Sequence, residues 1–156
     1  MDGVISLFGF DLSQPPAGHW RSVDGIPHYL STAAGEHLRA LSDLFELAWC
    51  TGWEEKANEY LPTALGLPWR LPHLCFGAVD RETRAHWKLA EVARFAGPDR
   101  PVAWIDDAHD HRCHAWASAR GAPTLLVATD PAIGITAEHV ELLRGWAVAQ
   151  ALAVSE

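Results

Sequence analysis

The chain has 156 residues, of which 49% are hydrophobic and 21% charged, and these values fit one globular domain rather than a fibrous or disordered protein. Twelve basic residues stand against twenty acidic ones, and the net charge of -8 argues against broad binding to nucleic-acid phosphates. No apolar run is long enough for a membrane span, the first residues show no secretory pattern, and three scattered cysteines make no disulfide framework. We therefore expect a cytoplasmic protein without a membrane partner.

The first third of the chain is the least regular part. Prolines and glycines across residues 11–28 predict a long loop or a short hairpin flap, within a flap region that covers residues 4–30. Ser31-Thr32 can cap a helix that continues to about Leu44. The apolar run 45–50 then predicts a short buried strand.

The rest of the chain alternates helices with strands. Helical spacing and terminal glycines predict helices over residues 54–65, 86–96 and 107–120, and Thr136 begins a last helix. Apolar runs predict strands over residues 71–76, 101–105 and 123–128. This alternation predicts a mainly parallel sheet covered on both faces, in a three-layer Rossmann-like α/β domain over residues 1–156.

Polar residues follow the predicted strands at their carboxyl ends, where sites form in parallel sheets. Thr51-Gly52 follows one strand, Asp106-Asp107 follows another, and Lys88 lies near the start of the helix between them. Paired carboxylates suit Mg²⁺, and a hydroxyl with an ammonium suits phosphate oxygens. The alternative for the two aspartates is an N-cap with a first-turn acid, Thr51 can also act as a cap, and a lone lysine is usually solvated.

In chain order, Asp2-Gly3-Val4, Thr51, Lys88 and Asp106-Asp107 resemble the motifs of the haloacid dehalogenase-like phosphohydrolase superfamily. Four stretches extend the resemblance to a compact subgroup without a large cap, and they read WCTGWEEKAN, HWKL, AWIDD and TLLVATDPAIGITAEHV. The order of the motifs disfavours a phosphoacceptor receiver domain, which opens with its acidic pair and ends with its lysine.

The resemblance implies a Mg²⁺-dependent phosphohydrolase. It implies that Thr51, Gly52 and Lys88 hold the phosphoryl group, that Asp2 acts as general acid and base, and that Asp106, Asp107 and Asp2 hold the metal ion. With minimal cap the site would be open, and such sites accept large phosphorylated substrates, including proteins and nucleic-acid ends. The net charge disfavours nucleic acid among these substrates.

The sequence departs from the family at the attacking aspartate. In one register Asp2 is the second acid of the first motif, so the nucleophile and its strand lie before residue 1. In the other register residues 4–10 (VISLFGF) are that strand, and Gly9 and Asp11 take the acidic positions. Both registers leave the family's first strand missing or substituted and predict an impaired hydrolase. The alternative is a catalytically inactive domain of this fold that binds a phosphorylated ligand or a protein partner.

A missing central strand would expose two strand edges. These edges would destabilise the chain, pair with a second copy in a homodimer, or recruit VISLFGF into the gap. The expectation that follows is that restoring an apolar strand ending in aspartate ahead of Met1 raises both stability and activity.

Three further features have two interpretations each. Residues 109–114, rich in histidine, are expected to form a solvated helix face rather than a metal site, because no single helix face gathers three good ligands. Asp110 is either a metal-supporting acid or a surface acid. Trp53 and Trp87 flank Thr51 and Lys88, and core packing is the favoured role over lining a substrate pocket.

Overall fold

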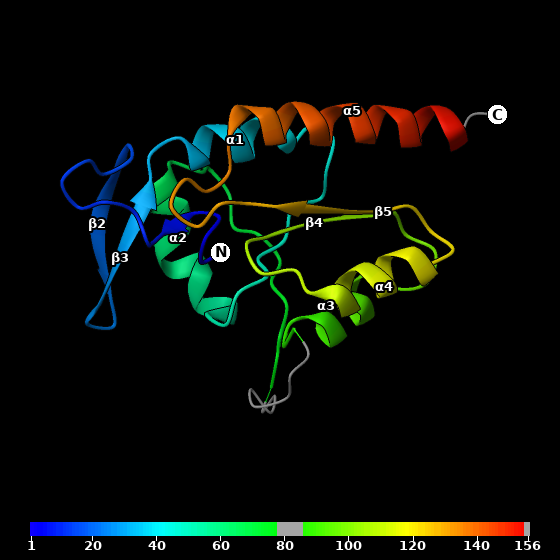
Figure 1. Ribbon diagram of the computed structural model, residues 1–156, viewed down its shortest axis with the longest axis horizontal. Coiled ribbons are helices and arrows are strands. Elements are labelled where there is room, and N and C mark those ends of the chain that lie inside the picture. The colour runs from blue at the N-terminus through cyan, green and yellow to red at the C-terminus, as the bar shows by residue number, and fades with distance from the viewer. Residues whose placement is uncertain (78–85, 155–156) are drawn as a thin grey trace.

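The computed structural model describes residues 1–77 and 86–154, which form a mixed α/β arrangement (Figure 1). A three-stranded antiparallel sheet has the order β1-β3-β2, and β4 and β5 form a parallel pair. In Figure 1, α1 and α5 lie on one side of this pair, and α3 and α4 lie on the other. In chain order the elements are β1 (Ser6–Leu7), β2 (Gly18–Val23), β3 (Ile26–Ser31), α1 (Ala34–Leu41), the 3-10 helix η1 (Glu54–Lys56), α2 (Ala57–Leu65), α3 (Leu89–Ala96), β4 (Val102–Asp106), α4 (His111–Ala119), β5 (Thr124–Ala128) and α5 (Ala137–Val154).

The parallel pair confirms two of the predicted strands. β4 and β5 run side by side in register from Val102 opposite Thr124 to Asp106 opposite Ala128. At one end the Val102 amide donates to the Pro123 carbonyl at 3.0 Å, and at the other the Thr129 amide donates to the Asp106 carbonyl at 3.1 Å. A connection through α4 joins the strands, as parallel neighbours require.

The predicted flap is a β-hairpin. β2 and β3 pair from Gly18 opposite Ser31 to Val23 opposite Ile26. The two turn residues, Asp24 and Gly25, have positive φ angles of 53° and 81°, which suit a tight hairpin turn.

The sequence VISLFGF does not fill a gap beside β4. Its strand β1 pairs with β3 of the antiparallel sheet, with Ser6 opposite Leu30. Of the outcomes considered for a missing central strand, recruitment of this segment into the parallel sheet is therefore wrong. The hairpin offers it a ready partner through the antiparallel ladder.

The predicted helices are present, but α1, α3 and α4 are shorter than predicted. Ser31 belongs to β3, and α1 begins after Ala33 without a side-chain cap, so the cap predicted at Ser31-Thr32 is wrong. Thr136 does begin the last helix, since its Oγ1 accepts from the His139 amide at 3.4 Å. No helix in the described ranges is long and apolar enough to cross a membrane.

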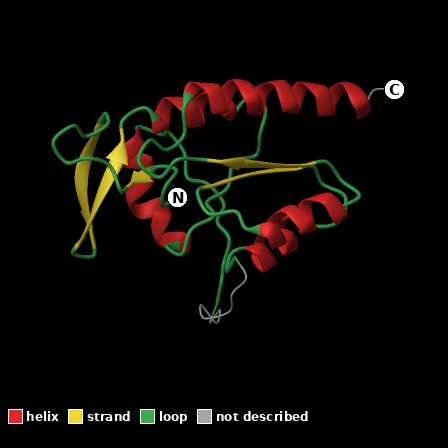
Figure 2. Cartoon of the chain, viewed as in Figure 1, coloured by secondary structure: helices red, strands yellow, loops and turns green. Residues whose placement is uncertain are grey.

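Two predicted strands are not strands. Residues 45–50 and 71–76 run as loop, drawn green in Figure 2, and meet in a single parallel bridge between Trp49 and His73. In the described ranges the parallel ladder is thus limited to β4 and β5, and the predicted mainly parallel sheet is not seen. An apolar run becomes a strand only where a second backbone continues the ladder beside it.

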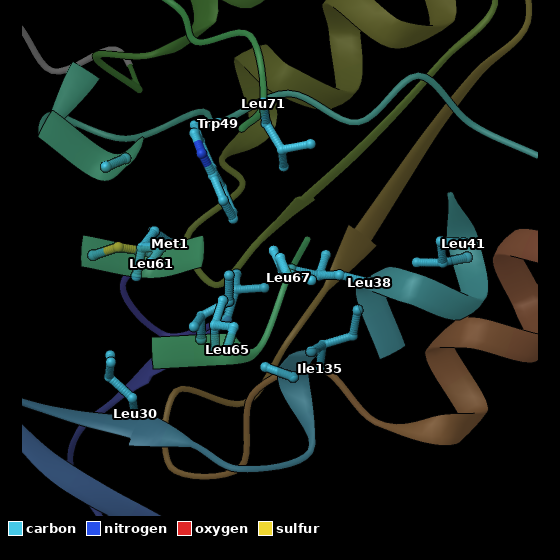
Figure 3. Close-up of a cluster of buried hydrophobic side chains, with 14 of the residues drawn as sticks. Met1, Leu30, Leu38, Leu41, Trp49, Leu61, Leu65, Leu67, Leu71 and Ile135 are labelled. Carbon is cyan, nitrogen blue, oxygen red and sulfur yellow. The ribbon is translucent and has the colours of Figure 1, made fainter. Parts of the chain in front are cut away.

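The core is built from leucines of the helices and the hairpin. Leu30, Leu41, Leu61 and Leu143 are each at most 2% exposed. Figure 3 shows Leu30, Leu41 and Leu61 in one cluster with Trp49 and Met1. This cluster joins the hairpin to α1, α2 and α5.

The contact between α1 and the end of α2 gives a test of this packing. A Cβ atom on Gly35 would overlap the carbonyl oxygen of Leu65, a backbone atom that cannot turn aside. We predict that Gly35→Ala lowers the free energy of unfolding by about 1–3 kcal/mol or more, because the two helices must separate. Urea unfolding monitored by circular dichroism measures this change in the free energy of unfolding.

Gly145→Ala is the matched control. Gly145 also lies in a helix, α5, but nothing lies within 4 Å of an added Cβ atom there. This variant is expected to leave stability unchanged or raise it by up to about 1 kcal/mol, through helix propensity. Equal stability of the two variants would contradict the close packing at Gly35.

Candidate functional site

Three predicted site residues are buried at the ends of their elements. Asp106 is the last residue of β4, Lys88 immediately precedes α3, and Thr51 lies in the turn before η1. Their exposed fractions are 1%, 6% and 1% in that order. Polar side chains of these types are seldom buried so completely without a partner, so their contacts decide what the site can do.

Asp106 and Lys88 form a buried ion pair. Lys88 Nζ donates to Asp106 Oδ2 at 2.6 Å. The other carboxylate oxygen, Oδ1, accepts from the Ala108 amide at 3.2 Å and lies 3.2 Å from His86 Nε2. Both oxygens of Asp106 are therefore occupied.

His86 belongs to the stretch HWKL that contains Lys88, and the sequence alone assigns it no role. Its side chain is 5% exposed, and its Nδ1 accepts from the Lys88 amide at 3.4 Å. A ring nitrogen that accepts carries no proton, so Nε2 holds the proton and donates to Asp106 Oδ1. The signal for this role was the position of His86 two residues before Lys88, which places both in the turn that leads into α3.

These contacts set the charge of Asp106. Burial by itself would raise the pKa of its carboxyl group, but the hydrogen bond from His86 and the charge and hydrogen bond of Lys88 outweigh it. The pKa of Asp106 consequently lies well below its ordinary value of 3.8. The group is a carboxylate at neutral pH, held by the Lys88 ammonium and by a hydrogen bond from His86.

Asp107 lies against the beginning of the chain. A Cβ atom on Gly3, whose φ is +68°, would overlap the Asp107 side chain, and the Gly3 carbonyl accepts from Thr129 Oγ1 at 2.8 Å. Burial, and then the charge of Asp106, raise the pKa of Asp107. The Asp2-Gly3 motif and the acidic pair thus come together as the sequence order suggests, on the ends of β4 and β5.

Asp2 is less engaged than its neighbours. It is exposed and forms an isolated bridge with Ser6. Among the described contacts its carboxylate has none with Asp106 or Asp107. The general acid and base role of Asp2 stays a prediction.

Thr51 caps a turn, in line with the alternative interpretation. Its Oγ1 accepts from the Trp53 amide at 3.3 Å. The preceding thiol, Cys50, lies close enough for the charges of Lys88 and Asp106 to act on it, and burial raises its pKa to about 11. The turn that carries Thr51 and Gly52 therefore borders the ion pair, although no hydrogen bond of the described residues joins Thr51 to Lys88.

The donor set does not fit Mg²⁺ on its own. No group of three or more histidine, cysteine or acidic side chains in the described ranges is arranged to hold a metal ion. Both carboxylate oxygens of Asp106 already contact Lys88, His86 or the Ala108 amide. Asp107 is then the adjacent carboxylate whose oxygens could still bind a metal ion. Mg²⁺ takes oxygen ligands from one or two carboxylates and from its substrate, so the predicted Mg²⁺ site needs a ligand beyond these.

Asp110 has a structural role that was not predicted. Its Oδ1 accepts from the amides of Arg112 and Cys113 at 2.9 and 3.0 Å, and so caps α4. Its Oδ2 accepts from the His86 amide at 3.1 Å. The backbone hydrogen bonds, that from Cys113 first, lower the pKa of Asp110 to about 2. The predicted start of α4 at Asp107 is therefore wrong, and so is the alternative interpretation of the acidic pair as its cap.

The histidine-rich stretch divides between surface and interior. His111 and His114 are exposed, as predicted. His109 packs edge-on against Trp104 at 4.7 Å between ring centroids, and neither of its ring nitrogens has a hydrogen-bond partner among the described residues. Burial lowers the pKa of His109 to about 4.

The two flanking tryptophans pack into the protein. Trp53 lies against the main core cluster and contacts His28 edge-on at 4.7 Å. Trp87 packs on Phe76 at 4.7 Å, and Lys88 Nζ lies 5.5 Å from the Trp87 ring centroid. Both rings therefore pack against apolar clusters, and Trp53 also lines a cavity of about 240 Å³ beside the hairpin.

Comparison with known proteins adds no relative to this picture. No model of a known protein family matches the chain, and no curated protein and no solved structure matches it either.

The two lysines of the chain test the energetic weight of the ion pair. We predict that Lys88→Met lowers the free energy of unfolding at pH 7 by about 3–5 kcal/mol, because it leaves the Asp106 carboxylate buried without its cation. Lys56→Met is the matched control, since Lys56 pairs with Asp24 at the surface, where an ion pair contributes about 0–1 kcal/mol. Urea unfolding of both variants measures the difference, and equal losses would contradict a buried pair.

The lowered pKa of Asp106 predicts a specific acid sensitivity. Because the folded pKa lies below the unfolded value, the unfolded chain takes up the proton first, and stability falls as pH drops through the unfolded pKa of about 4 and below. Asp106→Asn removes this contribution, so its free energy of unfolding should depend less on pH between about 5 and 2 than that of the unchanged chain. Parallel curves for the two proteins across this range would contradict the assignment.

Proposed function

We propose that residues 1–156 form a haloacid dehalogenase-like phosphohydrolase domain of the three-layer Rossmann-like type, whose phosphoryl group binds at Lys88. The observation that supports it is the buried Lys88 ammonium at the carboxyl end of β4, held by Asp106 beside the turn of Thr51. A fixed ammonium and a nearby hydroxyl suit the oxygens of a phosphate monoester. The motif order of the sequence adds to this support.

In this proposal each side chain has a separate task. Lys88 supplies positive charge to the phosphoryl oxygens, and Thr51 supplies a hydroxyl. Asp106 and His86 are positioning residues, because they act on Lys88 rather than on the substrate. Asp107 would be the carboxylate available to Mg²⁺, which would neutralise phosphate charge when bound.

Hydrolysis requires one more group. The attacking carboxylate of the proposed chemistry belongs two residues ahead of Asp2, a position that residues 1–156 do not contain. We therefore propose that these residues bind the phosphoryl group of a phosphorylated substrate, macromolecular ones included, and turn it over slowly.

A second candidate is a binding domain without hydrolytic activity. It is favoured by the incomplete set of metal donors around Asp106 and Asp107. In that case the same Lys88 and Thr51 hold a phosphorylated ligand or partner.

Inorganic phosphate and orthovanadate are suitable probes of the shared binding step. We predict that Lys88→Met and Thr51→Val each weaken binding at least about tenfold, a loss of about 1.4 kcal/mol, because each removes a donor to the anion. Lys56→Met should bind as the unchanged chain does. Isothermal titration calorimetry measures the affinities, and Thr51→Val, which replaces one hydroxyl by a methyl group and keeps the ion pair, keeps the test valid if Lys88→Met unfolds.

Equal phosphate binding by all variants would contradict the proposal. A turnover assay with an aryl phosphate and Mg²⁺ separates the two candidates. Slow turnover that Asp107→Ala abolishes supports a hydrolase, whereas phosphate binding with no turnover at any Mg²⁺ concentration supports the binding domain. Rapid turnover would mean that a carboxylate within residues 1–156 attacks the phosphorus.

A further inference from the structure

Strand β4 has a free edge on the side away from β5. Val102 and Asp106 direct their backbone groups toward β5, as the bonds to Pro123 and Thr129 show. Backbone groups of successive residues in a strand of a parallel sheet point to opposite sides, so Ala103 and Ile105 direct theirs away from β5. These groups have no hydrogen-bond partner among the described contacts, although both residues are partly buried.

A second free edge faces the first. Trp49 donates its amide to the Pro72 carbonyl at 2.8 Å and accepts from the Leu74 amide at 2.9 Å. By the same alternation its neighbours Ala48 and Cys50 direct their backbone groups to the other side. They too have no backbone partner in the described part of the chain.

The two edges run in the same direction. At their amino ends Glu46 and Arg100 approach to 3.8 Å. At their carboxyl ends the charge of Asp106 acts on the Cys50 thiol. We call the space between residues 46–50 and β4 the slot.

The slot is hollow and mainly apolar. Cavities of about 310 and 160 Å³ share Phe45, Glu46, Ala48, Cys50, Ala103 and Trp104 as lining residues. The larger cavity is closed by side chains of α3 and the second half of α5, and the smaller one by α1 and the beginning of α5. Side chains inserted on either side of the slot would therefore meet apolar walls.

Met1 marks the carboxyl end of the slot. It lines the smaller cavity together with Val4 and Ile5. The charges of Lys88 and Asp106 act on its amino group, and burial, followed by Lys88, lowers the pKa of that group. A strand that ran along β4 in the same direction would finish beside this amino group.

We propose that the slot is a binding site for one extended apolar polypeptide segment of about five residues, which runs parallel to β4 and finishes next to Met1. Only a polypeptide backbone offers donors and acceptors to both edges at the repeat of a strand, about 6–7 Å for every second residue. An apolar small molecule would fill the cavities but leave both edges unpaired. A second copy pairing edge to edge would satisfy one edge and leave the other.

This inference does not depend on phosphate chemistry. It rests on backbone directions and cavities, whereas the proposed function rests on Lys88 and Thr51. If phosphate did not bind, the inference about the slot would be unaffected. An occupied slot would not by itself show phosphate binding.

Joining a segment directly to the amino side of Met1 tests the proposal on the whole chain. One protein carries the five residues Val-Ile-Val-Ile-Val there, and its control carries Ser-Gly-Ser-Gly-Ser. We expect the apolar extension to raise Tm by about 5 °C or more over the control, as a buried strand should. We also expect amide hydrogen exchange at Ala103, Ile105 and Cys50 to slow at least about 100-fold, because these amides gain partners.

Ala103→Pro supplies the matched variant. Proline removes the amide that faces the slot and obstructs a strand there, yet it is tolerated at an edge whose amide has no partner. The substitution should cost the polar control little and abolish the gain in Tm of the apolar extension. Where Ala103→Pro does not fold, the exchange comparison between the two extended proteins decides the question.

Other outcomes overturn the proposal. Equal Tm and equal exchange for the two extensions would mean that the slot does not take a strand. A gain in Tm that survives Ala103→Pro, or one that appears only with dimer formation, would place the extension elsewhere. Saturable binding of the free peptide Val-Ile-Val-Ile-Val, flanked by lysines for solubility, with slowed exchange at the same amides, would support the site without a covalent link.

Discussion

The structure depends on a carboxylate that is buried at the end of β4. Asp106 is 1% exposed, and a charge in that position is tolerated only when cations and hydrogen-bond donors surround it. Lys88 supplies the cation and His86 a donor, so two residues from the start of α3 are fixed to the last residue of β4. Asp110 extends the link, because one of its oxygens caps α4 while the other holds the His86 amide. The ends of α3, β4 and α4 are thereby tied together by an ion pair and hydrogen bonds, in addition to the apolar cluster of Val92, Trp104 and Cys113.

The sequence predicted the helices, the strands β4 and β5, and the meeting of Lys88 and Asp106 at one end of the parallel pair. The apolar runs of β4 and β5 could be recognised because each is continuous and bounded by proline or by polar residues. Lys88 and Asp106 could be paired because residues at the ends of neighbouring elements meet at one edge of a sheet. Thr136 was recognisable as a cap because a hydroxyl stands directly before a helical run.

The predictions that were wrong are those that depend on contacts with residues far away in the sequence. The run 45–50 is as apolar as β5, but its strand character requires a neighbour on the side where the slot lies. Residues 4–10 carry the same kind of pattern, but their strand β1 pairs with β3, whose free edge is antiparallel to it. His86 was missed because one histidine in a sequence does not reveal its tautomer, and only the two contacts of its ring do so. Asp110, rather than the acidic pair, caps α4, because the Asp106 carboxylate is already engaged in the ion pair with Lys88.

The slot and the ion pair share one boundary, and this couples them physically. Cys50 and Asp106 end the two edges of the slot, and the same two residues lie next to Thr51 and Lys88. An occupant of the slot would fix the positions of these strand ends, and an anion at Lys88 would favour one arrangement of the same ends. Binding energies that depend on a shared arrangement are reciprocal, so any factor by which an occupied slot raises anion affinity must equal the factor by which the anion raises affinity for the strand. The size of that factor depends on how far residues 46–51 move when the slot is filled, because β4 is already fixed by β5 and by the ion pair.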